Sequence, residues 1–158
     1  MNVPALGPRG EGWVAAQLVL FAAIGLSGLA GISSISGGPA VPTLAPGAVI
    51  IAVGLLVAVR GALDLGSNLT PFPRPRAVAV LVDRGTYHFV RHPIYSGLVL
   101  AGVGWSIATV SPTALVLTGV LGLLFDAKSR REEAWLTERL PGYAAYRAHT
   151  RKFVPGLY

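Results

Sequence analysis

Two long stretches of the chain carry no charged residue, and polar segments lie between them and after them. The stretches cover residues 12–59 and 93–125. Clustered glycine and proline interrupt the first at Gly37-Gly38-Pro39 and again from Pro42 to Gly47, and Ser111-Pro112 interrupts the second. Each remaining piece is close to the ~20 apolar residues that a membrane-spanning helix needs. The pattern therefore predicts helices that cross a membrane.

We predict an all-α polytopic membrane protein, with about four transmembrane helices and a helical C-terminal tail, that forms one domain over residues 1–158. The predicted segments are spans at about 13–36, 47–65, 93–110 and 112–128, a loop at 66–92 and a tail at 129–158. In the tail we expect two helical stretches, separated by Pro141-Gly142. The apolar run from Ala77 to Val82 fits a strand-like segment and a helical turn equally, because so short a run has no decisive period.

Composition supports a membrane location. Hydrophobic residues make up 53% of the chain and charged residues only 13%, about half of the ~25% that is usual in soluble domains. A net charge of +6 on so apolar a chain is typical of basic loops at an anionic membrane surface, so we expect membrane lipids and no nucleic acid as partners. The absence of cysteine excludes disulfides, thiolate metal sites and cysteine nucleophiles.

The basic residues also predict an orientation. The breaks at 37–47 and Ser111-Pro112 contain none, whereas the loop 66–92 holds four arginines and the tail holds several basic residues. Basic loops stay on the cytoplasmic side, so we predict that both termini, the loop and the tail are cytoplasmic. The richness in Ala, Gly and Val is typical of a bacterial protein, which places it in the bacterial inner membrane.

Polar side chains gather in the stretch from Asp83 to Gly97, which holds two of the three histidines, two arginines and two tyrosines. Pro93 suits the first turn of a helix, where its missing N–H would have no intrahelical partner. Arg91 and His92 then lie at the positive end of that helix, which favours an anionic ligand.

Three other polar features have both a structural and a functional interpretation. Arg60 and Asp64 share a helix face and form either a helix-end salt bridge or part of a polar cavity. The pair Glu132-Glu133 follows two arginines and, taken alone, indicates a solvated helix face. His88 and His92 are four residues apart, but Pro93 opposes a continuous helix through both, so we predict no metal site.

Taken together, these motifs resemble a known membrane family. They are Gly85-x-Tyr87-x-x-x-Arg91-His92-Pro93-x-Tyr95-x-Gly97, Gly102-x-Gly104, Glu132-Glu133 and Gly142-Tyr143-x-x-Tyr146. The ordered set is similar to the isoprenylcysteine carboxyl methyltransferases and their bacterial relatives, which share motifs with phospholipid N-methyltransferases. The resemblance covers residues 68–155, and it is the order of the motifs, each weak alone, that makes it specific.

The resemblance implies an S-adenosylmethionine-dependent methyltransferase whose cofactor lies at the cytoplasmic edge of the helices. By the same resemblance, the catalytic residues are Arg91, His92 and Glu133. The implied cofactor-binding residues are Leu81, Val82, Tyr87, Arg91, His92, Pro93, Tyr95, Gly97, Gly102, Gly104, Glu132, Glu133 and Tyr146. Leu81 and Val82 would offer backbone groups to the adenine, and Gly102 and Gly104 would let the cofactor or a helix approach closely.

The expected methyl acceptor is a small lipophilic molecule or lipid that arrives from the bilayer: a carboxylate, an amine or an isoprenoid-like compound. The sequence does not predict an oligomeric state. Two alternatives remain open at this point. One is a membrane reductase of the sterol reductase type that uses NADPH, which Glu132-Glu133 disfavours. The other is a non-catalytic membrane partner protein whose polar loop is an interaction surface.

Overall fold

The chain folds into a bundle of long helices. The computed structural model describes residue 4 and residues 6–34 and 41–158. Its elements are the helices α1 (Glu11–Ser34), α2 (Val41–Leu65), α3 (Pro93–Ala108), α4 (Pro112–Arg139) and α5 (Tyr143–His149), with 3-10 turns η1 (Gly66–Asn68) and η2 (Gly85–His88). The described residues contain no strand, only one isolated bridge between Val90 and Arg151. The predicted all-α class is thus confirmed.

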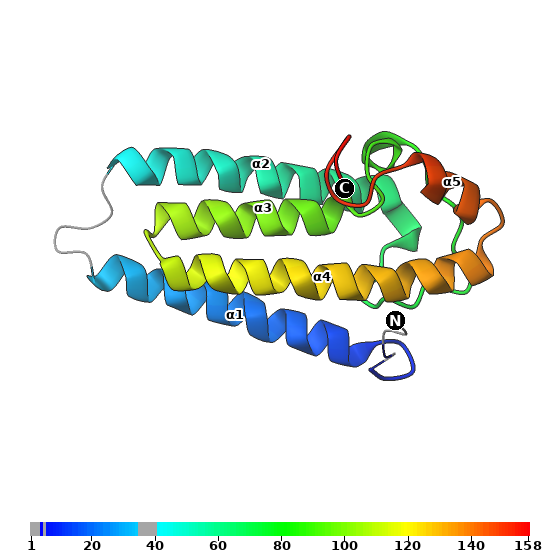
Figure 1. Cartoon of the computed structure of the whole chain (residues 1–158), viewed down its shortest axis with the longest axis horizontal. Coiled ribbons are helices and arrows are strands. Elements are labelled where there is room, and N and C mark those ends of the chain that lie inside the picture. The colour runs from blue at the N-terminus through cyan, green and yellow to red at the C-terminus, as the bar shows by residue number, and fades with distance from the viewer. Residues whose placement is uncertain (1–3, 5, 35–40) are drawn as a thin grey trace.

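The four long helices lie roughly along one axis. In Figure 1, α3 lies between α2 and α4, and α1 lies along α4 on the far side. The start of α1, the loop 66–92, α5 and the C-terminus all lie at one end of the bundle. This arrangement brings the two polar segments predicted from the sequence to the same end of the molecule.

Three helices in the described part of the chain are long and apolar enough to cross a membrane: Glu11–Ser33, Thr43–Asn68 and Pro112–Arg139. The apolar helix α3 is shorter, with 16 residues, or about 24 Å at ~1.5 Å per residue. It is covered by α2 and α4 and completes the predicted set of four. The protein is therefore an integral membrane protein.

Helix α4 continues beyond the predicted end of its span at residue 128. It runs unbroken for 28 residues, or about 42 Å, which exceeds a hydrocarbon core of ~30 Å. The span and the first helical stretch of the tail form one helix, because residues 126–139 contain neither proline nor glycine and are rich in Lys, Arg and Glu, all good helix formers. The polar half of α4 thus extends the transmembrane helix toward the loop 66–92.

The start of α2 also differs from the prediction. The helix begins at Val41 and includes Pro46, where the sequence predicted a break that extends to Gly47. Pro46 is the sixth residue of this helix, so the helix continues through it with one backbone hydrogen bond fewer. The predicted break at Gly37-Gly38-Pro39 and the predicted end of the first span at residue 36 lie outside the described residues.

Glycines seven residues apart bring α2 and α3 into close contact. Gly54 of α2 faces Gly97 of α3, and Gly47 of α2 faces Gly104. A Cβ atom built on any of these four would lie under 3.0 Å from backbone atoms of the partner helix. Gly61 continues the series against Pro93. Small residues at such a spacing allow the close backbone approach on which helix association in lipid depends.

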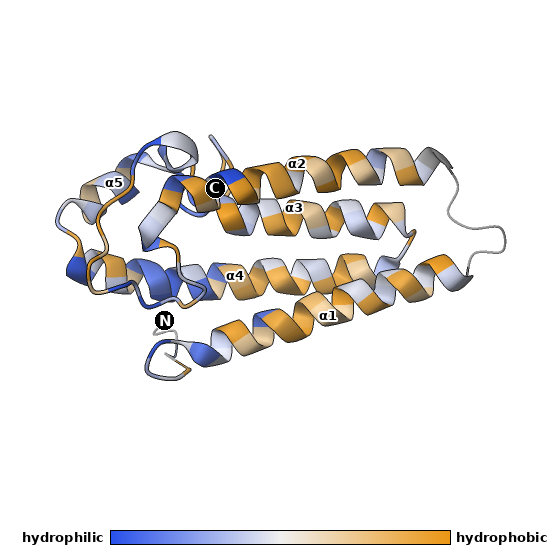
Figure 2. Ribbon diagram, turned by 180° about the vertical axis from the view of Figure 1, so that it is seen from behind, coloured by the Kyte–Doolittle hydropathy of each residue, from blue (hydrophilic) through white to orange (hydrophobic). Residues whose placement is uncertain are grey.

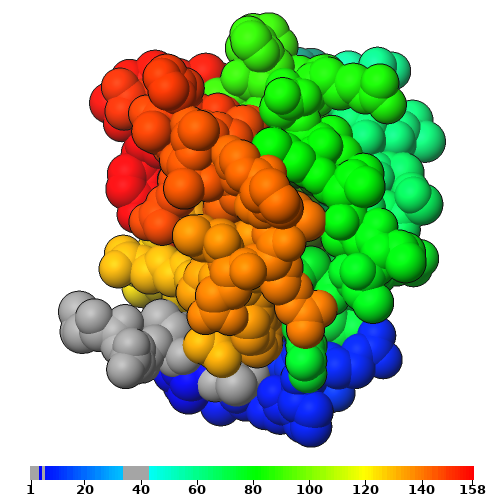
Figure 3. All heavy atoms as spheres, turned by 90° about the vertical axis from the view of Figure 1, so that its right-hand side faces the viewer, coloured from blue at the N-terminus to red at the C-terminus, as the bar shows by residue number. Residues whose placement is uncertain are grey.

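The polar end of the bundle is distinct from the apolar shaft. In Figure 2, hydrophobic residues run along the long helices, and hydrophilic residues gather around α5, the end of α4 and the loop 66–92. Figure 3 looks onto this end and shows the loop (green) packed beside the end of α4 and α5 (orange to red). Residues 77–82 form neither a strand nor a helix there.

Asp64 fastens the loop to the end of α2. Its carboxylate accepts hydrogen bonds from Thr86 N (2.8 Å) and Thr86 Oγ1 (2.9 Å) and pairs with Arg60 Nε at 3.2 Å. Gly85 has φ +62°, and a Cβ there would collide with the Asp64 carboxylate. Arg60 is 63% exposed, so the structure supports the helix-end salt bridge and gives Asp64 a second role in holding the loop.

Candidate functional site

The polar loop enters α3 as the sequence predicts. His92 is the N-cap residue and Pro93 occupies the first turn. The C-terminal segment after α5 holds this entry in place, because Arg91 N donates to Arg151 O (2.8 Å) and His92 N donates to Lys152 O (3.1 Å). Ser96 Oγ donates to Phe153 O at 2.8 Å. The start of α3 is thus positioned by residues about sixty positions later in the chain.

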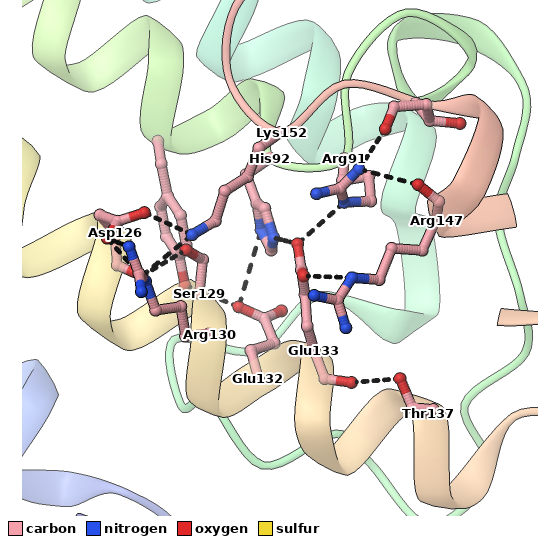
Figure 4. A network of polar contacts seen from close by, with 12 residues as sticks. Arg91, His92, Asp126, Ser129, Arg130, Glu132, Glu133, Thr137, Arg147 and Lys152 are labelled. Atoms are coloured by element: carbon pink, nitrogen blue, oxygen red, sulfur yellow. Dashed lines mark hydrogen bonds and ion pairs between the residues drawn. The ribbon is translucent and has the colours of Figure 1, made fainter. Parts of the chain in front are cut away.

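Glu133 of α4 is the centre of a buried ionic network (Figure 4). Arg91 Nε donates to Glu133 Oε1 at 2.8 Å, and His92 Nε2 lies 3.0 Å from the same oxygen. Arg147 Nε of α5 pairs with Glu133 Oε2 at 3.2 Å. Arg91 Nη1 also donates to the carbonyl oxygens of Arg147 and Thr150. A buried carboxylate therefore joins α3, α4 and α5, and an arginine compensates its negative charge at each of its two oxygens.

The neighbouring carboxylate, Glu132, is held differently. Its Oε2 accepts a hydrogen bond from Tyr95 OH at 3.0 Å and lies 3.9 Å from His92 Nδ1. His92 is thus placed between the two glutamates. Its ring stacks on Tyr95, which in turn stacks on Phe125, with centroid distances of 5.4 and 4.4 Å. The solvated-face interpretation of the glutamate pair is therefore wrong, since both side chains point into the polar end of the bundle.

These residues border a cavity of about 350 Å³, which lies in the range of small-molecule sites. We call it the site cavity. Its walls come from the loop 66–92, the start of α3, the polar half of α4, and α5. Three residues of α4 at a spacing of four, and the residue that caps the helix end, line one side, because that spacing places side chains on one helix face: Lys128, Glu132, Leu136 and the C-cap Leu140.

The structure brings most of the predicted site residues into this cavity. Those that line it are Leu81, Val82, Tyr87, Arg91, His92, Tyr95, Glu132 and Tyr146. Glu133 lies behind the wall, where it holds Arg91 and His92. Pro93, Gly97 and Gly104 lie at the contact between α3 and α2, and Gly102 faces Thr118 of α4. The structure gives the three glycines a role in helix packing.

Three tyrosines of the cavity wall lie outside the membrane-spanning segments. Burial raises the pKa of Tyr146 to about 12, and burial also raises the pKa of Tyr87 and of Tyr143 above the usual phenol range, with Glu132 or Glu133 adding to the shift. The phenols therefore remain neutral at physiological pH and keep the proton that a hydrogen-bond donor needs. Tyr146 OH donates to Tyr87 O at 2.7 Å.

Sequence reasoning did not identify Lys128 as a site residue. Its side chain is buried and lines the cavity, and Nζ donates to Gln17 Oε1 (2.7 Å) and Pro71 O (2.9 Å). The only sequence signal is its position four residues before Glu132, which places both on one face of α4. The charge run around it concealed this signal.

The described residues contain no group of three potential metal ligands. His88 is exposed and its ring contacts Phe89, while His149 Nδ1 donates to Ala145 O at 2.8 Å. Only His92 lies in the cavity wall.

Comparison with known proteins agrees with the geometry. The sequence profile of the phospholipid methyltransferase family matches residues 42–141, a region that includes α2, α3, α4 and the loop that lines the cavity. No curated protein and no solved structure matches the chain significantly. The match covers well over half of the chain and confirms the resemblance noted in the sequence, and it does not favour a reductase. The chain belongs to the phospholipid methyltransferase family.

Proposed function

We propose that this protein is an S-adenosylmethionine-dependent methyltransferase that binds its methyl donor in the site cavity and acts on a lipophilic acceptor. Membership in a methyltransferase family supports the reaction class. The single observation that carries the assignment of the site is its set of donors and acceptors. One cavity combines unpaired peptide groups, a carboxylate, a guanidinium and several aromatic faces.

The unpaired peptide groups belong to Leu81 and Val82. Both residues line the cavity, and no other residue that the structure describes hydrogen-bonds with their N–H or C=O groups. Unpaired backbone groups at a cavity wall are suited to the hydrogen-bonding edge of a purine. This fits the adenine of the donor. Leu81 also lies near Gly142, which places this end of the cavity beyond the last turn of α4.

Charged groups suit the amino-acid end of the donor. Glu132 Oε1 has no hydrogen-bond partner in the described part of the chain, and the side chain is 24% exposed, so one oxygen is accessible to an ammonium or to ribose hydroxyls. Arg91 commits Nε and Nη1 to protein oxygens and retains Nη2 for a carboxylate. Other aromatic side chains of the cavity wall, such as Tyr87 and Tyr146, can stabilise a sulfonium.

The bound donor supplies an activated methyl group on sulfur. The residues of this chain then have to align the acceptor with that group and exclude water. Arg91 and His92 touch the cavity, whereas Glu133 acts through them as a positioning residue. A carboxylate acceptor needs no base; for an amine, His92 is the wall residue best placed to accept a proton.

Binding of S-adenosylhomocysteine, the demethylated donor, tests this function. We expect saturable binding of S-adenosylhomocysteine to the purified full-length chain in detergent, measured by calorimetry, and none of NADPH. Glu132→Gln should weaken the binding by about tenfold because one ligand contact loses its charge. The matched control is Glu138→Gln, an exposed glutamate on the same helix. Binding of NADPH without binding of S-adenosylhomocysteine would contradict the methyltransferase proposal and favour a reductase. Binding of neither ligand would favour a non-catalytic partner protein.

We further propose that the polar end of the bundle faces the cytoplasm of a bacterial cell, with the protein in the inner membrane. The basic residues of the loop and of the tail lie at this end, as the positive-inside rule requires. Single cysteines at Arg84 and Arg139 should both react with a membrane-impermeant maleimide only after the inner face is exposed. The chain has no native cysteine, so each label reports one position. Labelling of the two positions from opposite sides would contradict the proposed site.

A further inference from the structure

Lys128 is a buried cation without an ionic partner. It is 1% exposed, and its two hydrogen bonds go to the neutral oxygens Gln17 Oε1 and Pro71 O. No carboxylate in the described ranges 6–34 and 41–158 lies within 4.0 Å of Nζ, and Glu132, one turn further along α4, acts on the ammonium charge from beyond that distance. Two cations of the polar network in Figure 4 do form ion pairs, Arg91 with Glu133 and Lys152 with Asp126.

An ammonium group has three donors, and two of those of Lys128 are used. Buried charges are costly unless they are paired. The remaining N–H belongs to a side chain that lines the site cavity and has its Nζ 5.2 Å from the centroid of the Tyr95 ring. An unpaired buried cation at a cavity wall indicates an anionic ligand.

The position of Lys128 favours the acceptor over the donor as the source of that anion. Leu81, where the adenine fits, lies near Gly142. Leu140, the residue that caps the end of α4, follows Lys128 by twelve residues, or about 18 Å along the helix axis. Lys128 therefore occupies the end of the cavity that faces the membrane, and Arg91 remains for the carboxylate of the donor.

A second, apolar recess adjoins this end. It has a volume of about 420 Å³ and lies among the four long helices, and Leu98 lines both the recess and the site cavity. Its other wall residues include Phe21, Ile24, Ile51, Trp105 and Leu121. A molecule with a hydrocarbon tail in the recess would therefore present its head group to Lys128.

We propose that Lys128 determines acceptor specificity by binding the carboxylate head group of a lipophilic acid whose tail occupies the apolar recess. This inference rests on the proposed methyltransferase function. A carboxylate oxygen of the acceptor forms the new O–C bond while the methyl C–S bond breaks, and sulfur keeps the electron pair and becomes a neutral thioether. No proton moves. The neutral ester loses its attraction to Lys128, which favours product release.

Competition binding tests the inference without turnover. The full-length chain in detergent, saturated with S-adenosylhomocysteine, is titrated with tritiated palmitate in a scintillation proximity assay. We expect unlabelled palmitate to compete and methyl palmitate and hexadecylamine to compete about tenfold less well or worse, because only the acid pairs with Lys128. Lys128→Met should weaken palmitate binding by about tenfold or more and leave S-adenosylhomocysteine affinity within about twofold of wild type. Lys128→Arg, which keeps the charge, should restore palmitate binding.

Each contrary result has a distinct meaning. The acid specificity is overturned if hexadecylamine competes with palmitate in the wild type as well as unlabelled palmitate does. It is also overturned if Lys128→Met binds palmitate as tightly as the wild type. If that variant fails to fold, the competition in the wild type still decides. A loss of S-adenosylhomocysteine affinity in folded Lys128→Met overturns it in favour of a role toward the donor. A wild type that binds S-adenosylhomocysteine but not palmitate overturns this inference alone. Palmitate binding without any S-adenosylhomocysteine binding overturns the proposed function.

Discussion

Replacement of Glu133 by glutamine is expected to lower the free energy of unfolding by about 3–5 kcal/mol, the usual cost of leaving buried charges without their partner. The carboxylate compensates Arg91 and Arg147 and contacts His92, and its side chain is only 3% exposed. A neutral amide of the same shape leaves the cations facing one another. Because Arg91 and His92 form part of the cavity wall, binding of S-adenosylhomocysteine should also weaken by about tenfold or more, or about 1.4 kcal/mol.

Two measurements check this prediction, denaturant unfolding in detergent and calorimetric titration with S-adenosylhomocysteine. Glu138→Gln is the matched control, because it removes the same charge from an exposed position one to two turns further along α4. The control should behave as wild type in both measurements. A Glu133→Gln protein with wild-type stability and wild-type affinity would show that the network around Glu133 does not position the site.

The second large effect is expected from Gly97→Leu at the contact between α2 and α3. A Cβ at this position would lie under 3.0 Å from Gly54 O and from Ala58 N, both backbone atoms that cannot move aside. Even alanine should cost about 1–3 kcal/mol through overpacking, and leucine should separate the helices. We expect a loss of the wild-type peak in size-exclusion chromatography for leucine, and a lower unfolding temperature for alanine.

Gly119→Leu is the control for this substitution. Gly119 lies in α4, and a Cβ there would meet no atom within 4 Å, so leucine should be tolerated and, as a better helix former, should slightly stabilise the helix. If Gly97→Leu unfolds at the wild-type temperature, close backbone contact is not what joins α2 to α3.

The helices could be predicted because a membrane leaves the backbone few alternatives. Inside lipid every N–H and C=O must be paired within the segment, so each long apolar run had to be a helix, and Pro93 marked a real helix start. The ends were harder to predict. Nothing in the polarity of residues 126–139 distinguishes a surface tail from the continuation of a spanning helix, although their helix propensity and the absence of proline before Pro141 were informative.

The site was predictable only in part, since its residues are distant in sequence. The predicted topology placed Arg91 and Glu133 at the same end of the bundle, but the prediction that they lie in one site depended on the resemblance to a family. The seven-residue spacing of Gly97 and Gly104 signals helix packing, and the sequence motif drew attention to Gly102 and Gly104 instead. The position of Lys128 four residues before Glu132 was a weak signal, and its neutral partners could not be predicted because Gln17 and Pro71 lie 111 and 57 residues away.

The contacts of Arg91 also constrain how the molecule is made. Its partners Glu133, Arg147 and Thr150 follow it by 42, 56 and 59 residues, and chains are synthesised and begin to fold from the N-terminus. While the ribosome adds these residues, α2 and α3 can already pack through their glycines, but the guanidinium of Arg91 has no carboxylate to bind. The site is therefore completed only after α5 and Thr150 have been translated, and a nascent protein can be inserted and helical long before its binding site is assembled.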